Sequence, residues 1–360
     1  MCPLRTRSSR AQRRRQVTGR LFSLAQSSVA SPAITVARQQ LCTASASTAH
    51  GHCPGGNPDM PKRVSTARGR EFGEGVRAAV EGAGLTSREI AEIVGCHESK
   101  VSDVLNGKGG VTQVEVALLL GICHTKAPEV AHLMDLFPMR HHGGGWWQEH
   151  GTCPPIKLRT AFENLKVAKT LVSWHANMVP FFLQTADYIR EVLRASATTP
   201  AEELEERAKA HLAMQQALPR NAKRLFFVHE SALRLQVGGP EVHAWQMQHL
   251  AVTANQSNTT IRIVPTARGA HAGMAGPFTL LTFEKYEPLV WVDTENSSLF
   301  AEATDAVKGY NTVVEALANT SLSEDESKEL IAEFSENAWT LADESAGLQT
   351  PSAGPVPPVP

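Results

Sequence analysis

The chain has 360 residues, of which 42% are hydrophobic and 20% charged, with a formal net charge of −1 at pH 7. This length is sufficient for two domains and a sizeable core. Its six cysteines form no C-x-x-C pair, which argues against a disulfide-stabilised secreted domain. The sequence contains no apolar run long enough to cross a bilayer, so neither a membrane span nor a membrane partner is expected.

The first 59 residues have a composition of their own. They hold eight arginines, no lysine and a single acid, Asp59, which gives 8 − 1 = +7. Without apolar periodicity they cannot bury a core, so residues 1–64 are predicted to be a disordered extension. Two alternatives remain open. An arginine-rich, acid-poor segment also fits an organelle transit peptide. A start codon placed too far upstream is the other, with Met60 as the first native residue.

Residues 65–140 are predicted to form an all-α domain of five short helices. The first should run from Arg68 to Ala83, with apolar side chains at every fourth position. Its apolar face consists of Phe72, Val76 and Val80. Thr112 and Glu115 form a capping box that starts the fourth helix, which ends at Gly121. The fifth helix is expected from Lys126 to Leu136.

The stretch from Gly84 to Gly110 predicts the second and third of these helices. Thr86 and Glu89 form another capping box, and Gly95 stops the helix that follows. The next helix, predicted over 97–106, ends at Asn106-Gly107. Its apolar face consists of Val101, Val104 and Leu105. Two short helices joined by a tight turn indicate a helix-turn-helix, with Ala91 where the helices cross.

The outward face of helix 97–106 carries short or hydrogen-bonding side chains, the kind that read base edges in a major groove. The predicted base-reading residues are His97, Glu98, Ser99, Lys100, Ser102 and Asp103. The predicted phosphate contacts are Thr86, Ser87, Arg88, Asn106 and Lys108. The alternative is a helical hairpin with a solvated polar face. Residues 61–110 have eight basic and seven acidic side chains, so general attraction to phosphate is weak. Moreover, His97 is a poorer helix cap than Ser, Thr or Asp.

After a Gly/Trp-rich linker over 141–160, residues 161–340 are predicted to form a mixed α/β domain, which makes the chain α+β overall. The expected helices are 184–195, 199–218, 242–254, 301–318 and 323–339. The expected strands are 224–229, 260–265, 278–284 and 289–293. Residues 341–360 are rich in Pro, Ser and Gly, which predicts a disordered tail.

The last two predicted helices each carry an apolar stripe. The stripes are Val313, Val314 and Leu317 on one helix, and Leu330, Ile331 and Phe334 on the other. They could pair with a second copy of the chain or cover the sheet. Because one helix-turn-helix reads only a half-site, we expect a homodimer on an inverted repeat.

Enzymatic motifs are absent from the sequence. H-E-x-x-H, the P-loop pattern and G-x-S-x-G all fail to match. His271, in the loop from Gly269 to Gly273, could be a base, a contact to a ligand or partner, or a loop-closing hydrogen bond. No catalytic residue, metal or cofactor is predicted, and an enzymatic second domain ranks third among the functional hypotheses.

Seven motifs occur in order along residues 65–340. They are Gly-Leu-Thr-Ser-Arg-Glu-Ile-Ala (84–91), Ser-Lys-Val-Ser (99–102), Gly-Trp-Trp-Gln-Glu (145–149), Val-Pro-x-x-Leu-Gln-Thr-x-x-Tyr (179–188), Glu-Ser-Ala-Leu-Arg (230–234), Val-Gly-Gly-Pro (237–240) and Gly-Ala-His-Ala-Gly-x-x-Gly-Pro-Phe (269–278). On these motifs the chain resembles a family of actinobacterial Xre-type helix-turn-helix transcription regulators with a conserved C-terminal domain of unknown function.

The resemblance implies binding of double-stranded DNA through residues 86–108 by a cytoplasmic, nucleoid-associated regulator. Relatives look antitoxin-like or developmental and often pair with a small protein encoded nearby. The alternative hypothesis is therefore an interaction protein that binds such a partner and autoregulates its own promoter. The chain departs from the pattern at Glu98, where relatives commonly have Gln, and at His97, where they have a Ser-like cap. The operator sequence therefore cannot be transferred.

Overall fold

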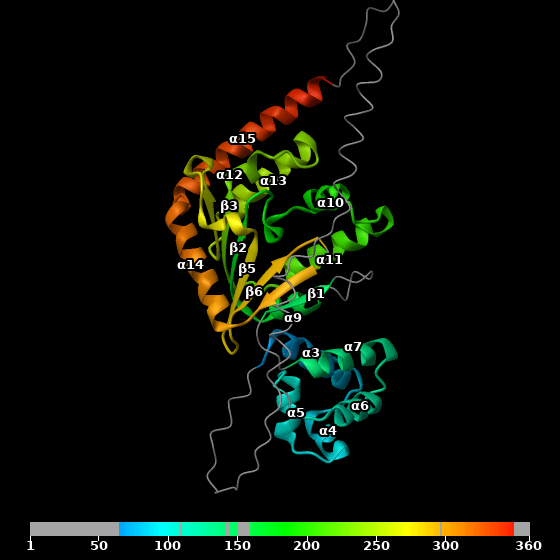
Figure 1. Ribbon diagram of the computed structural model, residues 1–360. Coiled ribbons are helices and arrows are strands. Elements are labelled where there is room, and N and C mark those ends of the chain that lie inside the picture. The colour runs from blue at the N-terminus through cyan, green and yellow to red at the C-terminus, as the bar shows by residue number, and fades with distance from the viewer. Residues whose placement is uncertain (1–64, 109, 141–144, 150–158, 296, 349–360) are drawn as a thin grey trace, which may run out of the picture. The chain divides into compact units, whose positions relative to one another are not determined.

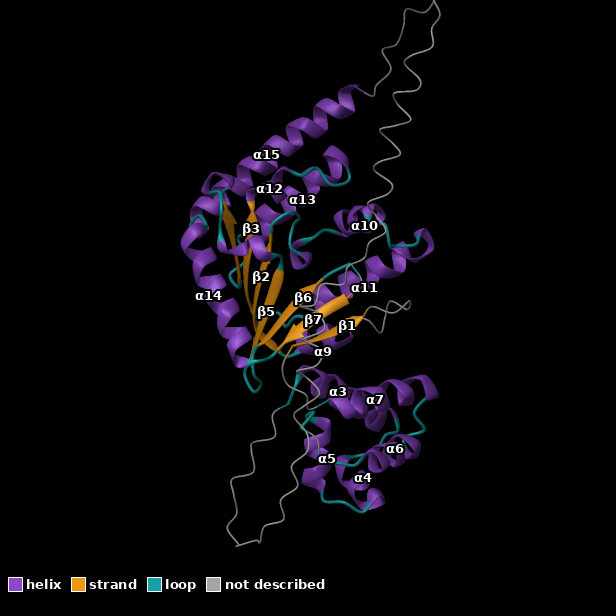
Figure 2. Cartoon of the chain, viewed as in Figure 1, coloured by secondary structure: helices purple, strands orange, loops and turns teal. Residues whose placement is uncertain are grey.

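The computed structural model describes residues 65–108, 110–140, 145–149, 159–295 and 297–348. A helical domain is followed by a domain built on a seven-stranded mixed sheet, which confirms the predicted α+β class (Figures 1 and 2). No helix in these ranges is long and apolar enough to span a membrane. The predictions for the amino-terminal extension and for Met60 fall outside the described residues.

The helical domain has the five helices that the sequence predicts. They are α3 (Ala67–Gly82), α4 (Ser87–Val94), α5 (Glu98–Leu105), α6 (Gln113–Ile122) and α7 (Ala127–Met139). Both predicted capping boxes form, at Thr86 and at Thr112. The helices bury a common core that includes Phe72, Val76, Ile90, Ala91, Val101, Val104, Leu120 and Leu133.

The turn after α5 lies directly against α3. Gly107 has φ +68°, and a Cβ atom there would lie 2.2 Å from the carbonyl oxygen of Gly69. On α3, a Cβ atom at Gly73 would lie 2.7 Å from the backbone nitrogen of Gly107. The turn and α3 therefore pack backbone on backbone, because both segments have glycine at the contact. This fixes the end of α5 to the rest of the domain.

The second domain is organised around one sheet in the order β1-β7-β6-β5-β2-β3-β4. The strands are β1 (Gly145–Glu149), β2 (Ala168–His175), β3 (Lys223–His229), β4 (Thr259–Val264), β5 (Phe278–Phe283), β6 (Leu289–Asp293) and β7 (Ser297–Ala301). Neighbours β2, β3 and β4 run parallel, and the other pairs are antiparallel.

Four of these strands are predicted and three are not. Strand β1 lies in the segment predicted as a linker, and the last residue of β7 lies in a segment predicted as a helix. No element is predicted for β2, although β2 lies in the middle of the sheet between β5 and β3. Its sequence, Ala-Lys-Thr-Leu-Val-Ser-Trp-His, places polar and apolar residues on both faces, so it lacks the alternation that marks a half-buried strand.

The helices of this domain are α9 (Arg159–Lys166), α10 (Ala186–Ala195), α11 (Leu204–Ala217), α12 (Glu230–Arg234), α13 (Gly239–Thr253), α14 (Thr304–Thr320) and α15 (Glu324–Leu348). Short 3₁₀ turns are η1 (Phe181–Leu183), η2 (Ala201–Glu203), η3 (Thr266–Arg268) and η4 (Ala272–Ala275). Two predictions need correction. Helix α14 starts at Thr304 because β7 precedes it. Helix α15 continues to Leu348, so residues 341–348 are not part of an unstructured tail.

The helices cover both faces of the sheet (Figures 1 and 2). On β3, Phe226 and Val228 face one core, which they share with α9, α11, α13 and α15. Between them, Phe227 faces the core on the other side, which α14 completes. The stripe of α14 packs on the sheet through Leu317, and that of α15 packs through Ile331. The stripes therefore pack within the chain, the second of the two readings, and the homodimer stays a prediction.

Candidate nucleic-acid interface

Helices α4 and α5 form the helix-turn-helix. Gly95 ends α4 with φ +73°, the left-handed conformation expected of a helix-terminating glycine. Ala91 is buried, 5% exposed, in the core that both helices share. The apolar side of α5, formed by Val101, Val104 and Leu105, is buried as predicted. One side of α5 is thereby fixed inward, and its polar side faces outward.

His97 caps α5 in spite of being an unusual cap. Its Nδ1 accepts a hydrogen bond from the backbone N–H of Ser99 at 3.2 Å, and the hydroxyl of Ser99 lies 2.9 Å from the same atom. Because Nδ1 is the acceptor, the proton of the neutral ring is on Nε2. His97 therefore presents an N–H donor on the exposed side of the helix start.

Four of the six predicted base-reading residues are exposed. They are His97, Glu98, Ser99 and Ser102. Asp103 is half-buried and Lys100 is engaged elsewhere. The Lys100 ammonium lies 2.7 Å from the Glu115 carboxylate on α6, and both side chains are about one-third exposed or less, 32% and 27%. Hydrogen bonds from Lys100 and then Thr112 lower the pKa of Glu115 to about 2. Lys100 thus joins α5 to the first turn of α6.

The predicted phosphate-contacting residues lie at the start of α4 and the end of α5. Thr86 and Arg88 are exposed and Ser87 is half-buried. Arg88 pairs with Glu92 at 3.3 Å, and both side chains are largely in solvent. At the other end, the Asn106 side chain donates to the carbonyl of Ser102 at 2.7 Å.

Lys108 is exposed after the Gly107 turn. Of the five predicted phosphate-contacting residues, Arg88 and Lys108 are the two that bring a positive charge. Arg88 shares its charge with Glu92, as described above, so Lys108 is the stronger candidate.

Arg77 holds the recognition helix in a way that the sequence analysis missed. Its guanidinium donates to the carbonyl of Leu105 at 3.0 Å and lies 3.3 Å from Glu74 on its own helix. A cation at the carboxyl end of a helix is favourable, because the free carbonyls carry partial negative charge. The sequence around Arg77 does not reveal this contact, because its partner, the carbonyl of Leu105, lies on another helix.

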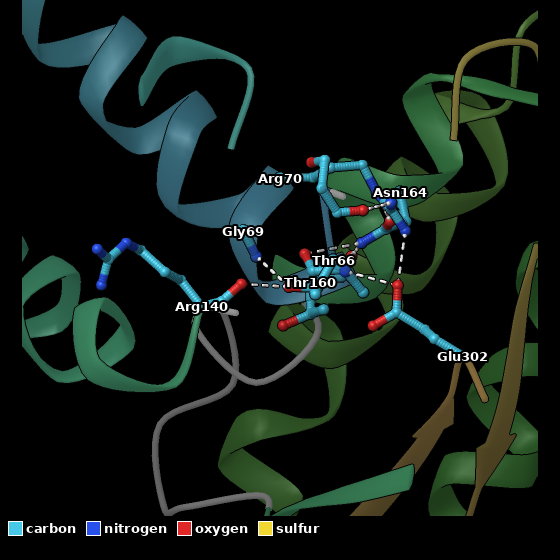
Figure 3. Close-up of polar contacts among 9 residues, drawn as sticks. Thr66, Gly69, Arg70, Arg140, Thr160, Asn164 and Glu302 are labelled. Carbon is cyan, nitrogen blue, oxygen red and sulfur yellow. Dashed lines mark hydrogen bonds and ion pairs between the residues drawn. The ribbon is translucent and has the colours of Figure 1, made fainter. Parts of the chain in front are cut away.

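The start of α3 contacts the second domain (Figure 3). Arg70 donates to Asn164 of α9 at 2.5 Å and lies 3.4 Å from Glu302, which follows β7. The same Glu302 carboxylate accepts the backbone N–H of Ala67 at 2.8 Å. Burial raises the pKa of Glu302, although Arg70 and the Ala67 N–H favour its charged form. The first helix is therefore part of both domains.

Two further polar contacts cross from the helical domain to α9. Glu129 of α7 and Arg159 form two hydrogen bonds of 2.8 Å, which raise the pKa of the Arg159 guanidinium. The buried carboxylate of Glu71 accepts the hydroxyl of Thr160, and its other oxygen lies 2.7 Å from His132. Residues 159 and 160 belong to the segment predicted as a linker, and they instead begin a packed helix.

His271 closes its own loop. It precedes η4, and its Nδ1 accepts the backbone N–H of Gly273 at 3.2 Å. The ring stacks on His229 at 5.4 Å and meets Trp174 edge-on at 5.1 Å. Burial and then the neighbouring His229 lower the pKa of His271. Of the three roles proposed for His271, the structure shows the loop-closing hydrogen bond. Among the described residues, no group of three or more His, Cys, Asp or Glu side chains is arranged to hold a metal ion.

Comparisons with known families agree with the division seen in the structure. Residues 71–133 match a family model described as a helix-turn-helix domain. Residues 160–333 match one described as a domain of unknown function (DUF5753). No curated protein and no solved structure gives a significant match to the chain. Residues 71–133 are therefore a helix-turn-helix domain, a kind of module that binds DNA, and residues 160–333 belong to a domain of unknown function.

Proposed function

We propose that the chain is a sequence-specific transcription regulator that places α5 in the major groove of DNA. The observation that carries the proposal is the exposed polar side of α5, on a helix whose other side is buried in the core. A helix fixed in this way presents the same atoms at each encounter, as base reading requires. The Arg77 and Gly107 contacts hold the end of the helix.

The exposed side chains offer complementary hydrogen-bonding groups. His97 supplies a donor at Nε2, which suits the acceptors of guanine. Glu98 is an acceptor, which suits the amino group of cytosine. Ser102 is exposed and can donate or accept. Lys100 contributes by positioning α6 beside α5, because its ammonium is already bound to Glu115.

Phosphate contacts would orient the domain on the duplex. At the first turn of α4 the Glu89 carboxylate accepts the Thr86 N–H and hydroxyl, at 2.8 and 2.7 Å, so Thr86 would reach a phosphate only by giving up these bonds, whereas Ser87 need not. Arg88 and Lys108 add positive charge on exposed side chains. These contacts carry no sequence information, so they would affect all DNA equally.

A twofold homodimer on an inverted repeat belongs to the same proposal, since one such module reads only a half-site. The stripes on α14 and α15 are used within the chain, so the dimer contact has to lie elsewhere. The proposal assigns the chain no enzymatic activity and no cofactor. A small partner protein encoded nearby remains a prediction from the resemblance.

The decisive experiment is selection of bound sequences from a randomised duplex pool by the full chain. A defined motif is expected, and Glu98→Gln or Ser102→Ala should change or blur it. Glu241→Gln on α13 is the matched control and should leave the motif intact. Enrichment of no motif by the wild-type chain, or of an identical motif by both α5 variants, would contradict base reading by α5.

A further inference from the structure

One end of the sheet in the second domain borders a cavity. The carboxyl end of β2, the start of β5 and the end of β6 meet there, because β5 runs antiparallel to both of its neighbours. Helix α11 and the turn η1 close the cavity from the side. The space measures about 480 Å³, its open mouth included. Concave, largely apolar spaces of this kind are the usual sites of small-molecule binding.

The walls of the cavity are flat and apolar. Phe181 and Phe182 from η1 meet edge-on at 5.0 Å. His211 of α11 packs edge-on against Phe181 at 4.9 Å. Aromatic walls of this kind favour a planar ligand body, since rings stack or meet edge-on at these distances.

Trp291 lines the cavity and carries a hydrogen-bond donor without a partner among the described residues. Its side chain lines the space and is 6% exposed, with its ring stacked on Phe300 at an interplanar angle of 6°. The indole Nε1 is buried and has no hydrogen-bond partner among the described residues. Indole N–H is a donor only, and leaving it unpaired in the protein interior is unfavourable. A ligand with a carbonyl oxygen would satisfy it.

The charge of the cavity is negative. Burial lowers the pKa of His175 and of His211 to about 4, so both rings are neutral at pH 7. Asp293 lines the cavity and part of its side chain stays exposed. Partial removal of its carboxylate from water raises its pKa to about 6. Neither Lys nor Arg occurs among the described lining residues. The carboxylate therefore favours a cationic group and disfavours an anion.

From these features we propose that the cavity binds a small planar molecule that carries a carbonyl acceptor and a positively charged amine. The carbonyl would accept the Trp291 N–H, the ring would lie against Phe181 and Phe182, and the amine would pair with Asp293. This site lies entirely within the second domain. It does not depend on the proposed DNA binding, so either can fail without the other.

Three para-substituted benzamides test the proposal on the full chain at neutral pH. They are 4-(aminomethyl)benzamide, 4-methylbenzamide and 4-carbamoylbenzoate, which share the ring and the amide and carry a cationic, a neutral and an anionic para substituent. Ligand-observed NMR titration gives their dissociation constants. We expect the cation to bind at least about tenfold more tightly than the anion, with the neutral compound between them. Equal binding of the three, or no binding of the cation at about 10 mM, would overturn the proposal.

Two variants identify the contacts. Asp293→Asn keeps an acceptor for the Ser298 hydroxyl, which lies 2.6 Å away, and should reduce the preference for the cation to about twofold or less. Trp291→Phe should weaken all three compounds by a similar factor. The matched controls are Asp305→Asn on the exposed side of α14 and Trp245→Phe, whose side chain is 53% exposed. If the wild-type chain shows the charge preference and Asp293→Asn, checked for folding by its thermal melt, retains it, the site lies elsewhere.

Discussion

Arg70 and Glu302 lie 232 residues apart in the sequence and form a buried ion pair of 3.4 Å between the helical domain and the sheet domain. Their side chains are 5% and 6% exposed. Arg70 also lies over the rings of Phe283 and Tyr286, at 4.8 and 4.9 Å from the ring centres. The helix that supports the helix-turn-helix is therefore anchored in the second domain by charge, hydrogen bonds and ring contacts together.

Removing one partner of this pair should be costly. Arg70→Met removes the ion-pair partner of the buried Glu302 and leaves it only the weaker interaction with Arg68, so we expect a loss of about 3–5 kcal/mol in the free energy of unfolding. The control is Arg88→Ala, since the Arg88–Glu92 pair is exposed and should contribute at most about 1 kcal/mol. Urea denaturation followed by circular dichroism measures both. A loss below about 1 kcal/mol for Arg70→Met would show that the pair is not buried in solution.

The contact between Gly107 and Gly69 makes a second prediction. Gly107→Ala adds a Cβ atom that meets the Gly69 backbone and also forces a side chain into positive φ. Gly95→Ala shares the positive φ but has open space around the added atom. We expect about 1 kcal/mol for Gly95→Ala and at least about 2 kcal/mol more for Gly107→Ala. Thermal melts compare the two, and equal losses would mean that the turn does not rest on α3.

Overpacking the crossing of α4 and α5 gives the third prediction. Ala91 is 5% exposed between the two helices. Ala91→Leu should cost about 1–3 kcal/mol, because three additional carbons have no space in a packed core. The melting temperature of the full chain should fall while that of Ala117→Leu, at an exposed position of α6, should not. An unchanged melt for Ala91→Leu would place the crossing elsewhere.

The fourth prediction separates phosphate contacts from base contacts. Lys108→Ala should weaken binding to every sequence and reduce the slope of log K against log salt by about one unit. Ser102→Ala should instead cost about 1–3 kcal/mol on the selected site and little on random DNA. Fluorescence anisotropy at several salt concentrations distinguishes them. The same loss on specific and random DNA for Ser102→Ala would remove that residue from the base-reading set.

Acid sensitivity provides the fifth prediction. The unfolded His175 takes up a proton near pH 6.5, whereas in the folded chain burial lowers its pKa to about 4. The unfolded state therefore binds more protons, and stability falls as the pH drops from about 6.5 to about 4. His175→Asn should lose less stability over that window, by roughly 1–3 kcal/mol. Parallel curves for the two proteins in urea titrations would contradict it. Asp293 acts in the opposite direction, because its raised pKa means that stability falls as the pH rises through about 6. This contribution is the same in the wild-type chain and in His175→Asn.

The sequence by itself determined the local features of the helix-turn-helix. Capping boxes at Thr86 and Thr112, the stop at Gly95 and the buried side of α5 all follow from residues within four positions of one another. Such patterns depend on backbone hydrogen bonds and helical periodicity, which are local. The four β-branched strand runs were found for the same reason.

Only the tertiary structure decided the long-range contacts. Arg70 lies about 200° around α3 from Phe72, on the side that a single apolar stripe leaves to solvent. It is buried because α9 and the end of β7 supply Asn164 and Glu302, and no periodicity shows partners 94 and 232 residues away. Lys100 was predicted to contact bases, but it is paired with Glu115 of α6, and a pattern within α5 does not reveal a partner on another helix.

The cavity residues gave no local sequence signal either. His175 and Asp293 end strands that are not consecutive in the chain, and His211 lies on a helix between them. The pairing of β2, β5 and β6 brings them to one edge of the sheet. Burial there depends on chain packing at a distance, so the same packing decides their pKa values and the shape of the site.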